Sequence, residues 1–397
     1  MSTQIKASVL HGVKDLRIVR HLSTGERAST DNLKETCKLP PPSATEVQVR
    51  IASTGLCGSD LHYYSHLRNG DILVREPLSL GHESAGVVTT VGSSVSSLAP
   101  GDKVALEVGL PCGQCPRCKE GRYNICKELR FRSSGKSFPH FQGTLQERIN
   151  HPAEWCYKLP EDVSLDLEPL GVALHAFRRS QMQKGATVLV FGAGAVGLLC
   201  AAVAKLKGAS KVMIADLDAG RLEFAVKNRF AHNSYTVPMR RGKDTHETLA
   251  IAKETAGDIG RVDDIGEVDI VFECTGVPSC VQAAIYATRP GGRLMLVGMG
   301  HPIQTLPLGA AALREVDIVG VFRYANTYPE SIEIVQLAVR SPEGPDLSKL
   351  VTHRFSGLEE ASKAFEMAGK TKDTDGKLVI KVVVDSSDGA GPASSTL

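Results

Sequence analysis

The sequence predicts an α/β protein in two parts, a β-rich first part and a doubly wound parallel sheet after it. Between Glu46 and about Val108, short runs of alternating apolar residues are broken by Gly and Pro, which is typical of strands in a partly closed barrel. From about Leu167 onward, apolar strands alternate with helical stretches, which favours parallel strands covered by helices. The 397 residues suffice for about two domains.

The elements of the first part follow from the positions of Gly and Pro. Residues 1–22 predict a short strand and a turn, and the polar residues 23–44 predict a surface loop. Strands with period-two alternation are then expected at residues 46–55, 83–92 and 101–109.

The second part opens on a recognisable unit, residues 186–218, which reads as strand, Gly-rich turn, helix and second strand. Two helical stretches and a closing strand at residues 377–385 follow from about Pro329. The tail from Ser386 is rich in Ser, Gly and Ala and predicts disorder. Further strands are expected at residues 268–276, 292–299 and 316–322.

Composition excludes several classes of function. The 46 Lys+Arg nearly balance the 44 Asp+Glu, which gives no reason to expect nucleic acid or an anionic membrane as partner. The sequence has no apolar run of transmembrane length, no apolar stretch of a secretory signal at its start, and no peroxisomal address at Leu397. A cytosolic location is therefore expected.

Four of the ten cysteines fall at a spacing that suits a metal, in the pattern Cys112-x-x-Cys115-x-x-Cys118 followed by Cys126. Cytosolic thiols stay mostly reduced, so disulfides are not the expected explanation. Four thiolates form a closed tetrahedral site typical of structural zinc. The alternatives are unrelated free cysteines or an iron–sulfur cluster, but the spacing does not match the common ferredoxin runs. Apart from Cys57, the remaining cysteines are expected to pack as small apolar residues: Cys37, Cys156, Cys200, Cys274 and Cys280.

The segment from Gly192 to Gly197 has the GxGxxG pattern, directly after an expected strand and at the start of an expected helix. In that context it predicts a dinucleotide-binding turn, with the pyrophosphate at the helix N-terminus. Asp216, at the end of the next strand, is expected to accept hydrogen bonds from ribose hydroxyls and to repel a 2′-phosphate, which favours NAD over NADP. The alternative is a structural Gly-rich turn in another α/β fold.

A third group is dispersed along the chain: Cys57, His82, Glu83 and Glu168. A catalytic zinc uses about three protein ligands and keeps one position open, and these are ligand types that it uses. Taken singly, each residue also has an ordinary explanation, such as a buried thiol, a core histidine or a solvated carboxylate. Spacing alone does not bring them together.

These motifs together resemble the medium-chain, zinc-containing alcohol dehydrogenase family, and within it the polyol branch of sorbitol, xylitol and L-arabinitol dehydrogenases. The resemblance runs from about residue 46 to about residue 383 and rests on GLCGSDLHYY, LGHESAGVV, GDKVALEVGLPCGQCPRC, GAGAVG, FECTG and FRYANTYP. It implies a GroES-like catalytic domain at residues 1–170 with a structural zinc lobe at about 109–128. A Rossmann NAD-binding domain at 171–321, a return to the catalytic domain at 322–385 and a disordered tail at 386–397 would follow.

The resemblance also implies roles for single residues. Cys57, His82 and Glu83 would bind the catalytic zinc, and Glu168 would hold its water or bind it directly. Ser59 and His62 would form the proton relay. The residues implied at the substrate hydroxyls are Tyr63, Arg323 and Tyr324. Those expected at the cofactor are Gly192, Gly194, Val196, Gly197, Asp216 and Arg221.

The expected function is zinc-dependent oxidation of a secondary hydroxyl of a small polyol to a ketose, with hydride transfer to NAD. The family also implies a homotetramer or homodimer, with strands after Gly291 pairing across subunits.

One departure matters: the run Ser164–Leu167 before Glu168 is shorter than the family usually has. Loss of about one helical turn would move that segment by roughly 5 Å. One alternative is therefore a catalytically silent NAD-binding protein of the same fold. Another is a zinc-free quinone reductase on this fold, which would have no use for Cys57, His82 and the four-cysteine lobe together.

Overall fold

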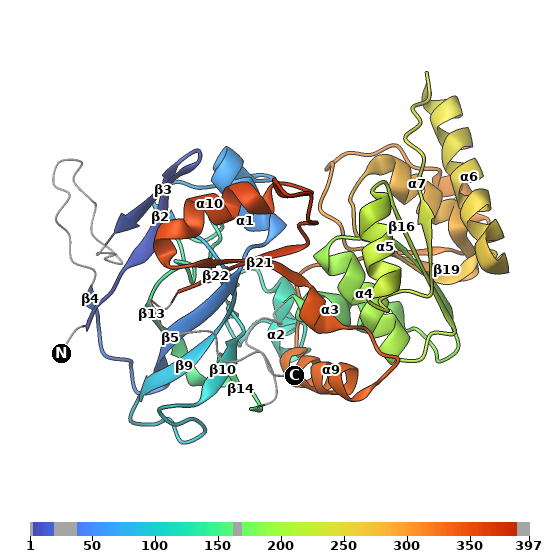
Figure 1. Ribbon diagram of the computed structural model, residues 1–397. Coiled ribbons are helices and arrows are strands. Elements are labelled where there is room, and N and C mark those ends of the chain that lie inside the picture. The colour runs from blue at the N-terminus through green and yellow to red at the C-terminus, as the bar shows by residue number, and fades with distance from the viewer. Residues whose placement is uncertain (1–2, 20–37, 162–168, 387–397) are drawn as a thin grey trace. The chain divides into compact units, whose positions relative to one another are not determined.

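The computed structural model describes residues 3–19, 38–161 and 169–386 of the chain (Figure 1). The chain divides into two compact units, Met1–Glu168 with Val351–Leu397, and Pro169–Leu350. The chain returns to the first unit at Val351 and not at the predicted residue 322. The difference arises because helix α9 (Tyr328–Arg340) packs on α3 (Leu170–Ser180) and α4 (Ala195–Leu206) of the second unit.

The first unit is built on a seven-stranded sheet in the order β14-β10-β9-β5-β22-β21, with β13 also paired to β5. All of its pairings are antiparallel except that of β21 with β22. Strand β5 coincides with the run expected at residues 46–55, and its alternation buries Val47, Val49 and Ile51. The strands are β5 (Glu46–Gly55), β9 (Glu83–Val91), β10 (Lys103–Leu106), β13 (Arg148–Pro152), β14 (Cys156–Lys158), β21 (Val351–Ser356) and β22 (Lys381–Asp385).

Shorter elements complete the first unit. Helix α1 (Gly58–His66) starts directly after β5, and α10 (Ala361–Ala368) packs on β22. A hairpin of β2 (Ala7–Gly12) and β3 (Asp15–Val19) extends to β8 (Leu78–Ser79). Small pairs join β1 (Thr3–Gln4) to β4 (Lys38–Leu39), β6 (Arg68–Asn69) to β7 (Ile72–Leu73), and β11 (Gly109–Leu110) to β12 (Arg130–Phe131). Helix α2 (Pro116–Lys119) lies in the cysteine segment.

The second unit contains a six-stranded parallel sheet in the order β17-β16-β15-β18-β19-β20. Counted along the chain this is the order 3-2-1-4-5-6 of the doubly wound fold. Helices α4, α5 and α7 pack on its strands (Figure 1). The strands are β15 (Thr187–Phe191), β16 (Lys211–Asp216), β17 (Asn233–Thr236), β18 (Val268–Glu273), β19 (Thr288–Leu296) and β20 (Asp317–Gly320), and the further helices are α5 (Ala219–Lys227), α6 (Thr245–Arg261), α7 (Pro278–Ala287) and α8 (Leu308–Ala312).

Three predictions fall on residues outside the described ranges. These are most of the loop at 23–44, the short segment that ends in Glu168, and the tail after Ser386. Among the described helices, none combines the length and the apolar character needed to cross a bilayer.

Candidate active site and metal centres

Cys57, His82 and Glu83 lie together in the first unit, with one ligand atom from each within 4.8 Å of the others. Cys57 follows β5 and occupies the N-cap of α1, while His82 and Glu83 lie at the start of β9. Strands β5 and β9 are antiparallel neighbours with Gly55 opposite Glu83. Residues far apart in the sequence therefore meet at one end of this strand pair.

His82 is held in place by a buried carboxylate, Asp60 on α1. Oδ1 of Asp60 lies 3.1 Å from Nδ1 of His82 and also accepts hydrogen bonds from Ser133 Oγ and Gly81 N at 2.5 and 3.3 Å. With Nδ1 engaged by the carboxylate, Nε2 of His82 is left as the metal-binding nitrogen. Oδ2 of Asp60 accepts a hydrogen bond from the backbone N–H of Cys57 at 3.4 Å. One carboxylate therefore contacts two of the candidate ligands, His82 and Cys57.

The buried charges of this cluster shift each other's pKa values. Burial favours a neutral Asp60, but the neighbouring His82 and the hydrogen-bond donors outweigh it, so the pKa of Asp60 is lowered. Burial favours a neutral His82 too, but the charges of Asp60 and Cys57 outweigh it, and the pKa of His82 is raised. A metal ion must displace that proton to bind, so its affinity depends on pH.

The three side chains fit a catalytic zinc. Thiolate, imidazole and carboxylate are ligand types that this ion takes, and three protein ligands leave a position for substrate. The orientation of His82 by Asp60 is the carboxylate–histidine arrangement common behind zinc ligands. Glu168, expected to hold water at this site, lies outside the described residues.

The predicted relay residues lie on α1, close to the cluster in sequence. Ser59 Oγ is 3.5 Å from Nε2 of His82. His62, one turn further along the helix, is exposed, and its ring lies 6.2 Å from that of His66. The predicted substrate residue Tyr63 is buried in the core of the first unit, with its hydroxyl 3.5 Å from Ser134 Oγ.

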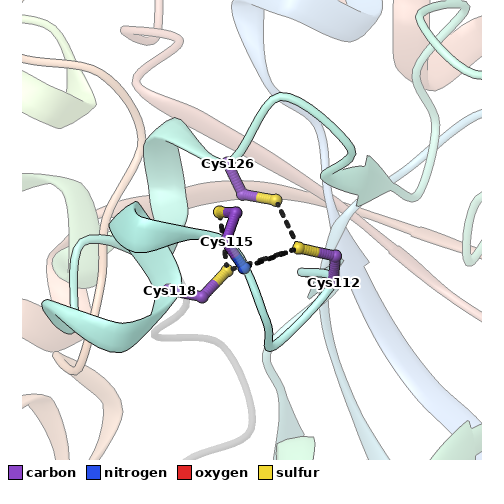
Figure 2. A group of neighbouring side chains, drawn as sticks. All are labelled: Cys112, Cys115, Cys118 and Cys126. Carbon is purple, nitrogen blue, oxygen red and sulfur yellow. Dashed lines mark hydrogen bonds between the residues drawn. The ribbon is translucent and has the colours of Figure 1, made fainter.

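Figure 2 shows Cys112, Cys115, Cys118 and Cys126 with their sulfur atoms turned toward a common centre. Sulfur–sulfur distances of 3.5 Å (Cys115–Cys118), 3.6 Å (Cys112–Cys126) and 3.9 Å (Cys112–Cys118) fit a single ion. Ligands about 2.3 Å from a tetrahedral zinc stand about 3.8 Å apart. Backbone N–H groups of Gln114 and Cys115 lower the pKa of Cys112 to about 7, which favours the thiolate that zinc requires.

The cysteine segment is tied to the sheet through a buried carboxylate, Glu107, which directly follows β10. Tyr123, between Cys118 and Cys126, donates a hydrogen bond to Glu107 Oε1 at 2.5 Å, and Tyr157 of β14 donates to Oε2 at 3.0 Å. Burial raises the pKa of Glu107 to about 6, although both hydroxyl donors act in the opposite direction.

The dinucleotide turn of the second unit has the predicted geometry. Strand β15 ends at Phe191, Gly192 adopts a φ of +98°, and α4 starts after its N-cap, Gly194. Its first N–H groups have no partners within the helix and are oriented to bind an anion. Val196 is in the first turn of α4.

Asp216 ends β16 beside this turn. Its Oδ2 accepts a hydrogen bond from Ala193 N at 2.6 Å, and its Oδ1 accepts one from Asp218 N at 2.9 Å. These bonds hold the carboxylate at the edge of the turn. Arg221 is in the first turn of α5, and its Nη1 would be 3.8 Å from a Cβ placed on Gly194. The structure thus brings the predicted cofactor-binding residues together.

Arg323 and Tyr324, predicted to contact substrate, follow β20 in the second unit. Arg323 has a φ of +52°, in the left-handed region that non-glycine residues seldom adopt, and its guanidinium lies 5.0 Å from the centre of the Phe322 ring. Tyr324 is buried, and its ring lies 5.7 Å from that of Tyr328. Strained backbone of this kind is concentrated at functional sites.

Sequence reasoning missed three residues that support these sites. Asp60 could have been found from its spacing, because it stands three residues after Cys57 at the start of a helix, where a carboxylate commonly caps. Lys381, which pairs with Glu83, is a single cation in the otherwise apolar run Val379–Val384. Nothing in the sequence marked Glu107.

Comparison with known proteins identifies the family of this chain. The model of the alcohol dehydrogenase GroES-like domain matches residues 43–161, and that of the zinc-binding dehydrogenase matches residues 195–336. Human sorbitol dehydrogenase is 40% identical over 366 residues, which cover 90% of this chain and 91% of the human protein. Sorbitol dehydrogenase from Arabidopsis thaliana is 39% identical over 337 residues, 84% of this chain and 87% of the relative.

Among solved structures, two from Escherichia coli have the same fold. An oxidoreductase/dehydrogenase of unknown specificity superposes with a TM-score of 0.78 at 30% identity, covering 97% of this chain and all of that one. L-idonate 5-dehydrogenase gives a TM-score of 0.78 at 25% identity, covering 97% of this chain and 99% of that one. The predicted GroES-like and Rossmann folds are confirmed.

Proposed function

Because the chain belongs to the zinc-containing medium-chain dehydrogenase family, in the branch of the sorbitol dehydrogenases, we propose that it oxidises one secondary hydroxyl of a small polyol to a ketone and transfers the hydride to NAD. As a family member it is an oxidoreductase with zinc and NAD as cofactors. The observation that carries the proposal is the meeting of Cys57, His82 and Glu83 in a chain 40% identical to human sorbitol dehydrogenase.

The residues of the first unit have distinct parts in this reaction. When bound, zinc acts as a Lewis acid toward a hydroxyl oxygen. Cys57, His82 and Glu83 would hold it, and Asp60, by engaging Nδ1 of His82, leaves Nε2 as the nitrogen that would bind it. Oγ of Ser59 would accept the proton of the substrate hydroxyl while releasing its own hydroxyl proton toward exposed His62, which would pass a proton on to solvent.

Specificity for a polyol rests on polar side chains that pair with its other hydroxyls. Tyr63, Arg323 and Tyr324 are the residues that we assign to this task. A site built to hydrogen-bond a hydroxyl rejects an analogue that lacks it, because its polar groups are then left unpaired. Ethanol should therefore be a poor substrate.

The second unit selects and positions the cofactor. NAD would supply the hydride acceptor. The N-terminus of α4 would bind the pyrophosphate, and Asp216, held by Ala193 N, would accept hydrogen bonds from the ribose hydroxyls and repel a 2′-phosphate. We therefore propose a preference for NAD over NADP.

Assembly into a homodimer or homotetramer is part of the proposal. Strand β20 is an edge of the parallel sheet, and unpaired edges offer hydrogen bonds to another chain. Large apolar side chains are exposed before it, at Met299, Ile303, Leu308 and Leu313. Such exposure is typical of an interaction surface. Sedimentation would give the oligomeric state, and a cytoplasmic location stays a prediction.

The test is NADH formation with sorbitol, xylitol, L-arabinitol and ethanol, with NAD or NADP, before and after treatment with a chelator. Chelator-sensitive turnover of polyols with NAD, and little with ethanol or NADP, would support the proposal and rank the substrates. A folded protein that contains zinc and binds NAD but turns over none of the polyols would instead support the catalytically silent alternative.

A further inference from the structure

Lys381, the first residue of β22, is a buried cation beside the Cys57–His82–Glu83 cluster. Its side chain and that of Glu83 are each only 6% exposed, and Nζ of Lys381 forms an ion pair with Oε2 of Glu83. The same Nζ donates a hydrogen bond to the backbone oxygen of Leu56 at 3.0 Å. Leu56 immediately precedes Cys57, so the ammonium contacts one candidate ligand, Glu83, and the residue before another.

The pair meets across a glycine. Strand β5 lies between β9 and β22, with Gly55 opposite Glu83 on one side and Val383 on the other. A Cβ at Gly55 would lie 2.6 Å from Oε2 of Glu83 and 3.0 Å from Cε of Lys381. Gly55 does not adopt a positive φ, so the glycine is needed here for space rather than for backbone conformation. The central strand therefore leaves room for these two side chains to touch.

Neither charge of the pair would be tolerated there alone. A buried carboxylate or ammonium loses its hydration and must be paired or neutralised. The ammonium of Lys381 contacts a carboxylate and a carbonyl oxygen, so its charge is compensated. Lys381 therefore stays charged among the buried valines of β22 because these oxygen atoms compensate its charge.

We propose that Lys381 is a positioning residue of the catalytic metal centre, holding Oε2 of Glu83 so that the carboxylate offers Oε1 to the metal beside Cys57 and His82. This rests on the proposed function, since it assumes that the cluster binds zinc. The thiolate and the carboxylate together would cancel the two positive charges of the ion. The ammonium adds one positive charge, which favours a strong attraction of the centre for a hydroxyl oxygen.

The test compares Lys381→Met, which keeps the length of the side chain without its charge, with Lys381→Arg, which keeps the charge. Lys363→Met is the control, because Lys363 is an exposed lysine of α10 in the same unit. Metal content, affinity of the cluster for zinc and the visible spectrum of the Co²⁺-substituted cluster are measured beside kcat and KM. For Lys381→Met we expect an altered Co²⁺ spectrum, roughly 10–100-fold weaker metal binding, and a larger loss in kcat than change in KM. Lys381→Arg should recover part of each, and Lys363→Met should match the wild type.

A thermodynamic cycle with Glu83 separates positioning from mere support of the fold. The double variant Lys381→Met/Glu83→Gln removes both charges together and so leaves no unpaired ion, which keeps the test available if Lys381→Met alone does not fold. If Lys381 acts through Glu83, Lys381→Met should change neither the Co²⁺ spectrum nor the metal affinity in the Glu83→Gln background.

Two results would overturn the proposal, and they are distinguishable from failure of the proposed function. In one, Lys381→Met lowers the Tm but leaves the Co²⁺ spectrum and the metal affinity unchanged. In the other, its effect persists in full in the Glu83→Gln background. If the wild type itself binds only one zinc per chain, at the four cysteines, then the proposed function and this inference fail together.

Discussion

Gly197 and Gly192 are in direct contact within the dinucleotide turn: a Cβ added to Gly197 would lie 1.8 Å from the carbonyl oxygen of Gly192. The start of α4 is packed this closely on the end of β15, and no side chain fits between them. Gly194, midway in the motif, differs from both. It has a φ of −81°, and a Cβ there would meet nothing nearer than Nη1 of Arg221 at 3.8 Å.

This difference predicts opposite outcomes for two alanine substitutions. Gly194→Ala should leave the Tm nearly unchanged but weaken NAD binding by about tenfold or more, because its methyl group occupies the space through which the pyrophosphate approaches. Gly197→Ala should lower the Tm and NAD binding together, because the helix must move off the strand. Calorimetry measures the Tm of each variant, and fluorescence titration with NADH measures its affinity for the cofactor. Unchanged NADH binding in Gly194→Ala would place the pyrophosphate elsewhere.

The sequence specified those sites whose residues are close along the chain. The four cysteines and the glycine turn with Asp216 each lie within one or two successive elements, so spacing was enough to predict them. Cys57 and His82 belong to separate elements, and they meet because β5 and β9 pair in one register. Register is set by packing of the whole sheet and not by spacing, so the residues alone left that site open.

The contacts of Lys381 were even less predictable from residue spacing. It reaches Leu56 and Glu83 only because the chain returns to the first sheet after completing the second unit. Asp60 lies at the other extreme, three residues from Cys57, and a capping analysis would have found it. The boundary at residue 322 was placed from resemblance, whereas the packing of α9 on α3 and α4 keeps residues up to Leu350 in the second unit.

Asp60→Asn should weaken zinc binding at the catalytic cluster by roughly 10–100-fold. The amide keeps the size of the carboxylate but loses its charge, and its NH₂ group can face Nδ1 of His82, which favours the wrong tautomer. Zinc competition with a chelator measures the change. Asp71→Asn is the matched control, because Asp71 is fully exposed and its ion pair with Arg68, at 3.8 Å, is on the surface. Equal zinc affinity in Asp60→Asn and the wild type would show that the carboxylate does not orient His82.

Cys118→Ser should reduce the zinc content from two ions per chain to one and lower the Tm of the first unit. Three thiolates and a hydroxyl bind zinc far less tightly than four thiolates, and a structural zinc contributes on the order of 10 kcal/mol to the segment that it holds. Metal analysis and calorimetry measure the two effects. Cys280→Ser is the control, since Cys280 lies outside both described metal clusters. Two zinc ions in purified Cys118→Ser would contradict a four-cysteine site.

Glu107 should make the stability of the first unit fall as pH rises from about 4.5 to about 6. Burial raises its pKa from 4.5 to about 6, so the folded state holds the proton more tightly than the unfolded state does. Below pH 4.5 both states are protonated and the carboxyl imposes no penalty. Above pH 6 the folded state contains a buried carboxylate, which costs roughly 2 kcal/mol at 1.36 kcal/mol per pKa unit.

Glu107→Gln isolates this contribution, because the amide does not titrate but still accepts a hydrogen bond from Tyr123. The Tm of the wild type minus that of Glu107→Gln should fall by roughly 4–8 °C between pH 4.5 and pH 6.5 in zinc-replete protein. Exposed Glu154, next to Trp155, provides the control variant Glu154→Gln, which removes a surface carboxyl in place of the buried one. A constant difference for Glu107→Gln would mean that the hydroxyl donors Tyr123 and Tyr157 balance the burial of the carboxyl, and a difference that rises with pH would mean that they outweigh it.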